Sequence, residues 1–196
     1  MSRAAQLAAI VLVALTGCSP LLSAPERTAA PLPSAAESGP QQAPAGPHHI
    51  AEGRVFDAAA DDVGGTEVCD GRAGRETLET FDRAAWPELD LPAGDADLTC
   101  GNADGAGWRH IADGHTGDFG ELGELVDAGW EDVAWFAIDR ALEQPTRVER
   151  YRDDIVNYDV LVEYVDAGQV ERSWVVTVGV GLGSGQIITS FPDEQR

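Results

Sequence analysis

Hydrophobic and polar positions follow a helical pattern in the middle of the chain. Between residues 121 and 144, apolar side chains recur at spacings of three and four residues, with acidic side chains and arginine between them. This spacing is typical of an amphipathic helix whose apolar face covers a sheet. We expect a break at Gly129 and an end at Pro145, because proline cannot continue a helix. The recurring apolar residues are Val133, Ala134, Ala137, Ile138, Ala141 and Leu142.

After Pro145 the pattern changes from helix to strand. Segments rich in β-branched and aromatic residues alternate with glycine-containing turns, which predicts a series of hairpins. Trp174, Val176 and Val178 would share one face of such a strand and pack against the helix. Helices followed by consecutive hairpins predict an α+β fold, with helices packed on one face of an antiparallel, meander-like sheet. The predicted strands are 148–152, 155–165, 170–180 and 186–191.

Residues 51–106 have a weaker pattern, and we interpret them as a cap on the core. Arg54–Asp57 predicts a short strand, and residues 76–85 predict a helix that ends before Pro87. Cys69 and Cys100 are an even pair in a chain with export features, which predicts a disulfide within this cap. A metal pair and free thiols are the alternatives, and neither has a supporting spacing.

The chain begins with features of an export signal. Arg3 precedes an apolar run from Ala4 to Leu15, which is too short to span a bilayer and fits a signal peptide over residues 1–17. Leu15-Thr16-Gly17-Cys18 resembles the bacterial lipobox. The resemblance implies that Cys18 is lipidated and becomes the mature N-terminus, anchored by acyl chains. We therefore expect a lipoprotein on the outer face of the cell membrane, with the membrane as its partner through Cys18.

Residues 18–50 are rich in proline, alanine and serine and poor in large apolar side chains. Such a segment cannot bury enough surface to offset its ordering entropy. We interpret it as a tether between the lipid and a single domain over residues 51–196. His48 and His49 lie at the end of the tether and are expected to be solvated rather than to act as ligands.

Charge excludes several function classes. The chain has 34 acidic residues and 13 basic ones, giving a net charge of −21, and every basic residue is arginine. A Schiff-base lysine and a phosphate-loop lysine are therefore excluded. The acidic surface disfavours nonspecific binding of polyanions, so RNA is a disfavoured partner, and the sequence does not identify a protein partner.

Candidate chemistry begins at residues 108–115, which contain two of the four histidines. Histidine suits proton transfer because its ordinary pKa lies near neutral pH. Gly114 is expected to interrupt a short helix here. On an uninterrupted helix His110 and His115 would lie about 140° apart, so only one of them need face a cleft. Their spacing is not that of two metal ligands on one helical face, and we expect neither a metal nor a cofactor.

Arginines that could bind a phosphate follow the main helix. Arg147, Arg150 and Arg152 lie within six residues, and the planar guanidinium can hold a phosphate with two hydrogen bonds. In a regular strand Arg150 and Arg152 would project to one face, and Thr189 in the last strand would add a hydroxyl. Three alternatives stay open. In the first, the arginines only balance neighbouring carboxylates. In the second, His110 is a partly buried core residue, and in the third, Thr189 is an ordinary strand residue.

The order of these features resembles a known group of domains. Trp108-Arg109-His110-Ile111, His115 and Phe119 come first, then the helix ending at Pro145, the arginines with Tyr151, and finally the segment 185–192. This order resembles the C-terminal ribonuclease domains of bacterial polymorphic and contact-dependent toxins, in the broad barnase/EndoU/colicin/RelE-like group.

The resemblance covers about residues 107–192 and implies roles for five residues. His115, with His110, would be the acid–base histidine, Arg150 or Arg152 the phosphate-binding arginine, and Thr189 the hydroxyl residue. This chain has Gly114 where such toxin domains often have a basic residue, and it is acidic where they tend to be basic. Two functions follow: a membrane-anchored ribonuclease that works without metal, or a non-catalytic surface domain that binds a protein or an envelope component.

Overall fold

The computed structural model describes residue 44 and residues 46–195. The predicted signal peptide, the candidate lipidation site Cys18 and the tether up to residue 43 lie outside these residues. Within the described part of the chain, no helix is both long and apolar enough to cross a membrane.

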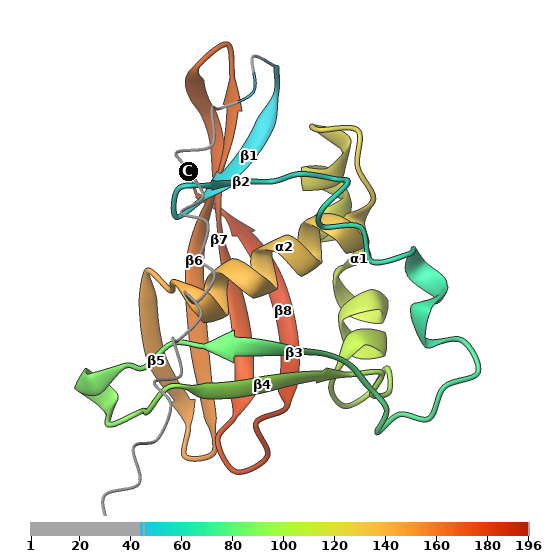
Figure 1. The fold of residues 1–196 in the computed structure, drawn as a ribbon, viewed down its shortest axis with the longest axis vertical. Coiled ribbons are helices and arrows are strands. Elements are labelled where there is room, and N and C mark those ends of the chain that lie inside the picture. The colour runs from blue at the N-terminus through green and yellow to red at the C-terminus, as the bar shows by residue number, and fades with distance from the viewer. Residues whose placement is uncertain (1–43, 45, 196) are drawn as a thin grey trace, which may run out of the picture. The chain divides into compact units, whose positions relative to one another are not determined.

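The described residues form a six-stranded antiparallel sheet, a two-stranded sheet and two α-helices (Figure 1). Strands β5 (Arg147–Arg152), β6 (Ile155–Asp166), β7 (Gln169–Gly181) and β8 (Ile187–Glu194) follow one another as neighbouring hairpins. This order confirms the predicted meander and the α+β class. Strand β1 (His48–Ala51) pairs with the far end of β6, and β2 (Arg54–Val55) pairs with β1.

Both helices pack on the apolar side of this sheet. Helix α2 (Trp130–Glu143) crosses one face of β6 and β7 (Figure 1). The predicted apolar face of β7 is confirmed, because Trp174, Val176, Val178 and Val180 are each at most 2% exposed. Helix α1 (Trp108–Glu124) lies beside β8 (Figure 1).

A small hairpin covers the same sheet face below α2 (Figure 1). It consists of β3 (Thr77–Arg83) and β4 (Gly94–Thr99), with short 3₁₀ turns η1 (Thr66–Cys69) and η2 (Pro87–Leu89) nearby. The ring of Phe81 meets that of Trp135 on α2 at 5.4 Å. The predicted disulfide is confirmed, since Cys69 in η1 bonds to Cys100 after β4 with their Cα atoms 5.5 Å apart.

The predicted helix over residues 76–85 is wrong, because β3 occupies this segment. β-Branched Thr77 and Thr80 favour an extended backbone, and the strand pairs antiparallel with β4 through a bulge between Thr77 and Glu79. Phe81 is buried against α2 between exposed neighbours, which is the alternation of a strand with one covered face.

The predicted break at Gly114 is also wrong, because α1 continues through this residue to Glu124. Each glycine destabilises a helix by about 1 kcal/mol relative to alanine. Tertiary packing offsets this cost. The buried residues Trp108, Ile111 and Phe119 fix the helix against the rest of the core.

Strand β1 begins at His48, three residues before the predicted domain boundary at residue 51. His49 is fully buried, and its Nε2 donates to the Leu122 carbonyl at 2.8 Å. Burial lowers the pKa of His49, and the hydrogen bond to Leu122 partly opposes that shift. The two histidines are therefore part of the sheet and core rather than solvated. Likewise β1 and β2 belong to the main sheet and not to a cap.

Candidate functional site

The two histidines of α1 lie close together. The His115 side chain is 24% exposed, and its Nδ1 donates to Asp118 Oδ2 at 3.0 Å. His110 Nδ1 donates to the Ala103 carbonyl at 2.8 Å. The ring centroids are 6.4 Å apart in an edge-to-face arrangement. The two rings therefore lie near each other, although the residues are about 140° apart around the helix axis.

Phe191 connects His115 to a hollow in the sheet. The Phe191 ring lies 5.5 Å from that of His115, measured between centroids, and it also lines a hollow of about 270 Å³. Two of the predicted site residues, Arg152 and Thr189, line the same hollow, whereas His115 and His110 do not. The full lining consists of Tyr151, Arg152, Ile155, Asn157, Gly179, Ile188, Thr189 and Phe191.

Strand pairing explains why these residues meet. Asn157 on β6 lies opposite Gly179 on β7, and Gly179 lies opposite Thr189 on β8. The three residues form one row across the sheet. In the next row on the same face of the sheet, Thr177 lies opposite Phe191. Side chains in these rows point away from the face that α2 covers, because they alternate with the buried valines of β7.

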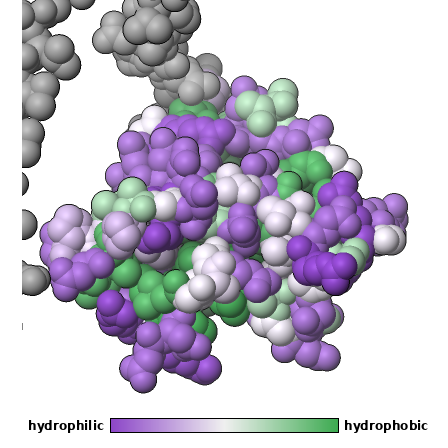
Figure 2. Space-filling view, turned by 60° about the horizontal axis from the view of Figure 1, so that its bottom comes forward, coloured by the Kyte–Doolittle hydropathy of each residue, from purple (hydrophilic) through white to green (hydrophobic). Residues whose placement is uncertain are grey.

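Tyr151, Arg152 and Ile155, which line the hollow, flank the β5–β6 turn, and this turn is at the lower end of the sheet in Figure 1. Figure 2 brings this end of the molecule forward. Its surface is mostly hydrophilic, and a smaller group of apolar side chains reaches the surface among the polar ones. Tyr151, on the rim of the hollow, is 58% exposed.

A bulge separates the two arginines that were predicted to share a face. Arg150 pairs opposite Val156, and the register then shifts so that Arg152 pairs opposite Ile155. Because the partners are consecutive residues of β6, Arg150 and Arg152 face opposite sides of the sheet, and the prediction is wrong. Arg150 Nη2 donates to the Leu89 carbonyl at 3.2 Å, away from the hollow.

Three polar side chains line the hollow without using their hydrogen-bonding capacity. Within residues 44 and 46–195, the side chains of Arg152, Asn157 and Thr189 form no hydrogen bond or ion pair. The Arg152 guanidinium carbon lies 5.0 Å from the Tyr151 ring centroid, in cation–π contact. Polar groups that converge on an apolar hollow are typical of a ligand site.

Gly179 keeps the middle of the hollow open. A Cβ atom at this position would lie 3.4 Å from Thr189 Cγ2 and 3.5 Å from Asn157 Oδ1. Any side chain would therefore fill the space between these two residues. Glycine within a strand weakens the strand and often marks a place where a ligand or another backbone approaches closely.

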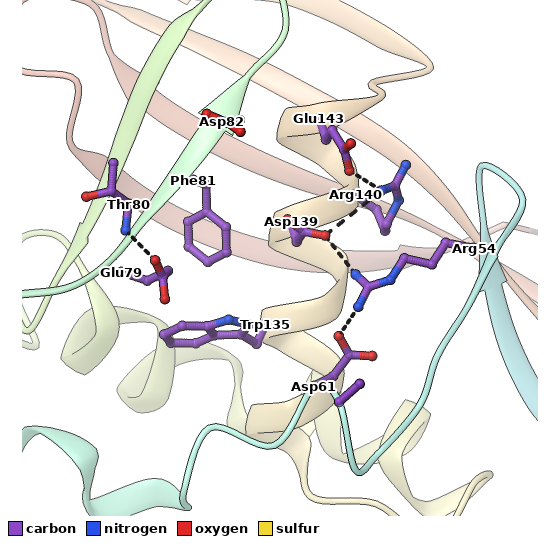
Figure 3. A pocket seen from close by; sticks show the side chains of 11 residues that line it. Arg54, Asp61, Glu79, Thr80, Phe81, Asp82, Trp135, Asp139, Arg140 and Glu143 are labelled. Carbon is purple, nitrogen blue, oxygen red and sulfur yellow. Dashed lines mark hydrogen bonds and ion pairs between the residues drawn. The ribbon is translucent and has the colours of Figure 1, made fainter. Parts of the chain in front are cut away.

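A second hollow, of about 490 Å³, lies between α2 and β3 (Figure 3). Five of its seven charged side chains form ion pairs with one another. Arg54 bonds to Asp61 and donates to Asp139 Oδ2 at 2.7 Å, while Arg140 pairs with Glu143. Burial raises the pKa of Asp139, and the two neighbouring arginines partly oppose this shift. These ion pairs join β2 to α2, so the hollow has a structural explanation that the first hollow lacks.

Asp159 lies two residues from Asn157 on the same face of β6, and its carboxylate has partners within the fold. Thr177 Oγ1 donates to Asp159 Oδ1 at 2.8 Å, and Arg147 Nε lies 3.6 Å from Oδ2. Burial raises the pKa of Asp159, and the contacts with Thr177 and Arg147 oppose it. Among the described residues, no group of three or more His, Cys, Asp or Glu side chains is arranged to hold a metal ion.

Sequence reasoning found Arg152 and Thr189 but missed Asn157, Gly179 and the apolar walls of the hollow. Comparison with protein-family models, with curated proteins and with solved structures finds no match to this chain. The geometry of the hollow therefore carries the argument about function.

Proposed function

We propose that this protein is an exported lipoprotein that is anchored at Cys18 to the outer face of the cell membrane and binds an envelope component or a partner protein through the hollow beside Gly179. One observation carries the binding function. Arg152, Asn157 and Thr189 converge on a partly apolar hollow, and none of the three is satisfied by a described residue. The lipobox-like segment ending at Cys18 supports the anchor, and the long proline-rich segment after it supports a tether.

Binding is tested with the full chain and isolated envelope fractions of the producing bacterium. Gly179→Val fills the hollow, because its side chain extends from a Cβ that already touches Thr189 and Asn157. Gly183→Val is the matched control, since its added Cβ meets nothing within 4 Å. We expect saturable co-sedimentation of the wild type and the control, and loss of binding by Gly179→Val at an unchanged or raised melting temperature. Equal binding by all three proteins refutes the proposal.

The anchor is tested separately. Mass spectrometry of the membrane-extracted protein is expected to find an N-terminus at Cys18 carrying a diacylglyceryl group. The variant Cys18→Ala should lose that modification. A mature N-terminus at a residue other than Cys18, or an unmodified Cys18, refutes the proposed anchor. Neither result bears on the binding proposal.

A second candidate function is cleavage of RNA without metal. It is favoured by the position of His115, which pairs with Asp118 and contacts Phe191 at the border of the hollow. A histidine oriented by a carboxylate is a plausible acid–base group. The net charge of −21 and the position of Arg150 on the other sheet face weigh against it.

The ribonuclease candidate has its own test. The full chain is incubated with RNA and a chelator, and the products are examined for cyclic phosphate ends. Cleavage that disappears in His115→Ala but persists in the exposed Asp113→Ala variant supports the enzyme. Cleavage no higher than that of the His115→Ala variant refutes it.

A further inference from the structure

We infer that the hollow beside Gly179 takes a single ring that carries a carboxylate, with Arg152 as the residue that binds the carboxylate. This inference rests on the proposed binding function and specifies its ligand class. It is argued from the charge, the size and the floor of the hollow.

The charge of the site points to one anionic group. Acidic residues outnumber arginines by 34 to 13, yet Arg152 has no carboxylate partner among the described residues. Its neighbour in sequence of the same type, Arg150, faces the other side of the sheet. A lone guanidinium matches a carboxylate, which it can hold with two parallel hydrogen bonds. A doubly charged phosphate would lack a second cation in the lining of this hollow.

The size of the hollow points to one ring. Liquid water takes roughly 30 Å³ per molecule, so a hollow of about 270 Å³ has room for roughly nine waters or one substituted ring. This is below the usual range for drug-sized ligands. The walls formed by Ile155, Ile188 and Phe191 offer apolar contact to the faces of such a ring.

The floor adds polar contacts at defined places. Asn157 and Thr189 flank Gly179 in one row, and their side chains are half-buried and unpartnered. The amide can donate and accept, and so can the hydroxyl. A ring with the carboxylate at Arg152 would direct its other polar substituents toward this row. A sugar acid and an aromatic acid both satisfy these contacts, and the experiment distinguishes them.

The experiment is a ligand-observed NMR titration of the full chain in detergent micelles. Glucuronate is compared with glucose, and benzoate with benzyl alcohol, so each acid has a neutral counterpart. Arg152→Gln removes the charge at an exposed position. Arg75→Gln is the control, because Arg75 is likewise exposed and has no partner in the described part of the chain.

We expect one acid to bind more tightly than its neutral counterpart, with a loss of about tenfold or more in Arg152→Gln and no change in Arg75→Gln. Preference for glucuronate assigns a sugar acid, and preference for benzoate assigns an aromatic acid. The inference is overturned if acids and neutral compounds bind equally, if none of the four binds, or if Arg152→Gln binds like the wild type.

The envelope assay separates this inference from the proposed function. Envelope binding that Gly179→Val abolishes and Arg152→Gln leaves intact overturns the carboxylate inference alone. Envelope binding that neither substitution changes overturns the proposed function as well.

Discussion

We expect Gly179 to lower the stability of the fold while it leaves the hollow open. Gly179→Ala should therefore make the protein more stable. The residue lies inside β7, and its backbone does not adopt the left-handed conformation that favours glycine. Alanine can therefore replace it without backbone strain. The new methyl would contact Thr189 Cγ2 at 3.4 Å and Asn157 Oδ1 at 3.5 Å, and the threonine methyl can turn away.

The expected gain follows from two effects. Glycine within a strand is less favourable than alanine by about 0.5–1 kcal/mol, and burial of a methyl group contributes up to about 0.8 kcal/mol more. The close contact with Thr189 offsets part of this sum. A net gain of about 0.5–1 kcal/mol corresponds to a rise in melting temperature of about 1–4 °C for a domain of this size.

Thermal unfolding of the full chain, followed by circular dichroism, measures the effect. Gly101→Ala provides the contrast, because Gly101 has a φ of 61° and its added Cβ would lie 1.6 Å from the Ala106 carbonyl oxygen. That overlap with backbone should destabilise the fold by about 2 kcal/mol or more. A fall of several degrees in the melting temperature of Gly179→Ala would refute the view that glycine at this position lowers stability while it keeps the hollow open.

Three further predictions concern the free energy of unfolding, measured with urea. Burial lowers the pKa of His49, so the unfolded chain binds a proton more readily than the folded chain. The free energy of unfolding should therefore fall as the pH drops below about 6.5. His49→Gln should flatten this pH dependence. Burial raises the pKa of Asp159, so the folded chain keeps the proton on this carboxyl to a higher pH than the unfolded chain does. The resulting contribution to the free energy of unfolding is present below the ordinary pKa of 3.8 and is lost as the pH rises through the raised pKa. Subtracting the pH dependence of Asp159→Asn from that of the wild type should show this contribution. Replacing Cys69 and Cys100 by alanine opens a loop with a sequence separation of 31 residues, which should cost about 3.7 kcal/mol in the chain-entropy model; a loss below about 1 kcal/mol would contradict that estimate.

The sequence predicts the long periodic elements of the fold well. Helix α2 and the hairpins β5 to β8 have patterns that extend over many residues, and their packing follows from those patterns. Shorter elements depend on contacts that the local sequence does not contain. Residues 76–85 are a strand because β4 pairs with them, and α1 continues through Gly114 because its buried residues pack on the core. His49 is in the core because β1 pairs with β6.

The candidate site could be predicted only in part, for a related reason. Arg152 and Thr189 have suitable side chains, but their meeting depends on strand register. The bulge in β5, which separates Arg150 from Arg152, has no sequence signal that we recognise. One signal was present and missed. Gly179 interrupts a run of valines in β7, and an isolated glycine in a strand pattern indicates a bulge or a close approach.

The most direct test of the central claim is an NMR titration of isoleucine methyl groups in the full chain with a soluble digest of the cell envelope. Ile155 and Ile188 line the hollow, whereas Ile111 and Ile138 are fully buried in the core. Binding at the hollow predicts saturable shifts of the Ile155 and Ile188 methyl signals, with those of Ile111 and Ile138 unchanged. Binding without any shift at Ile155 and Ile188, or no saturable shift at all, would contradict the assignment of this hollow as the binding site.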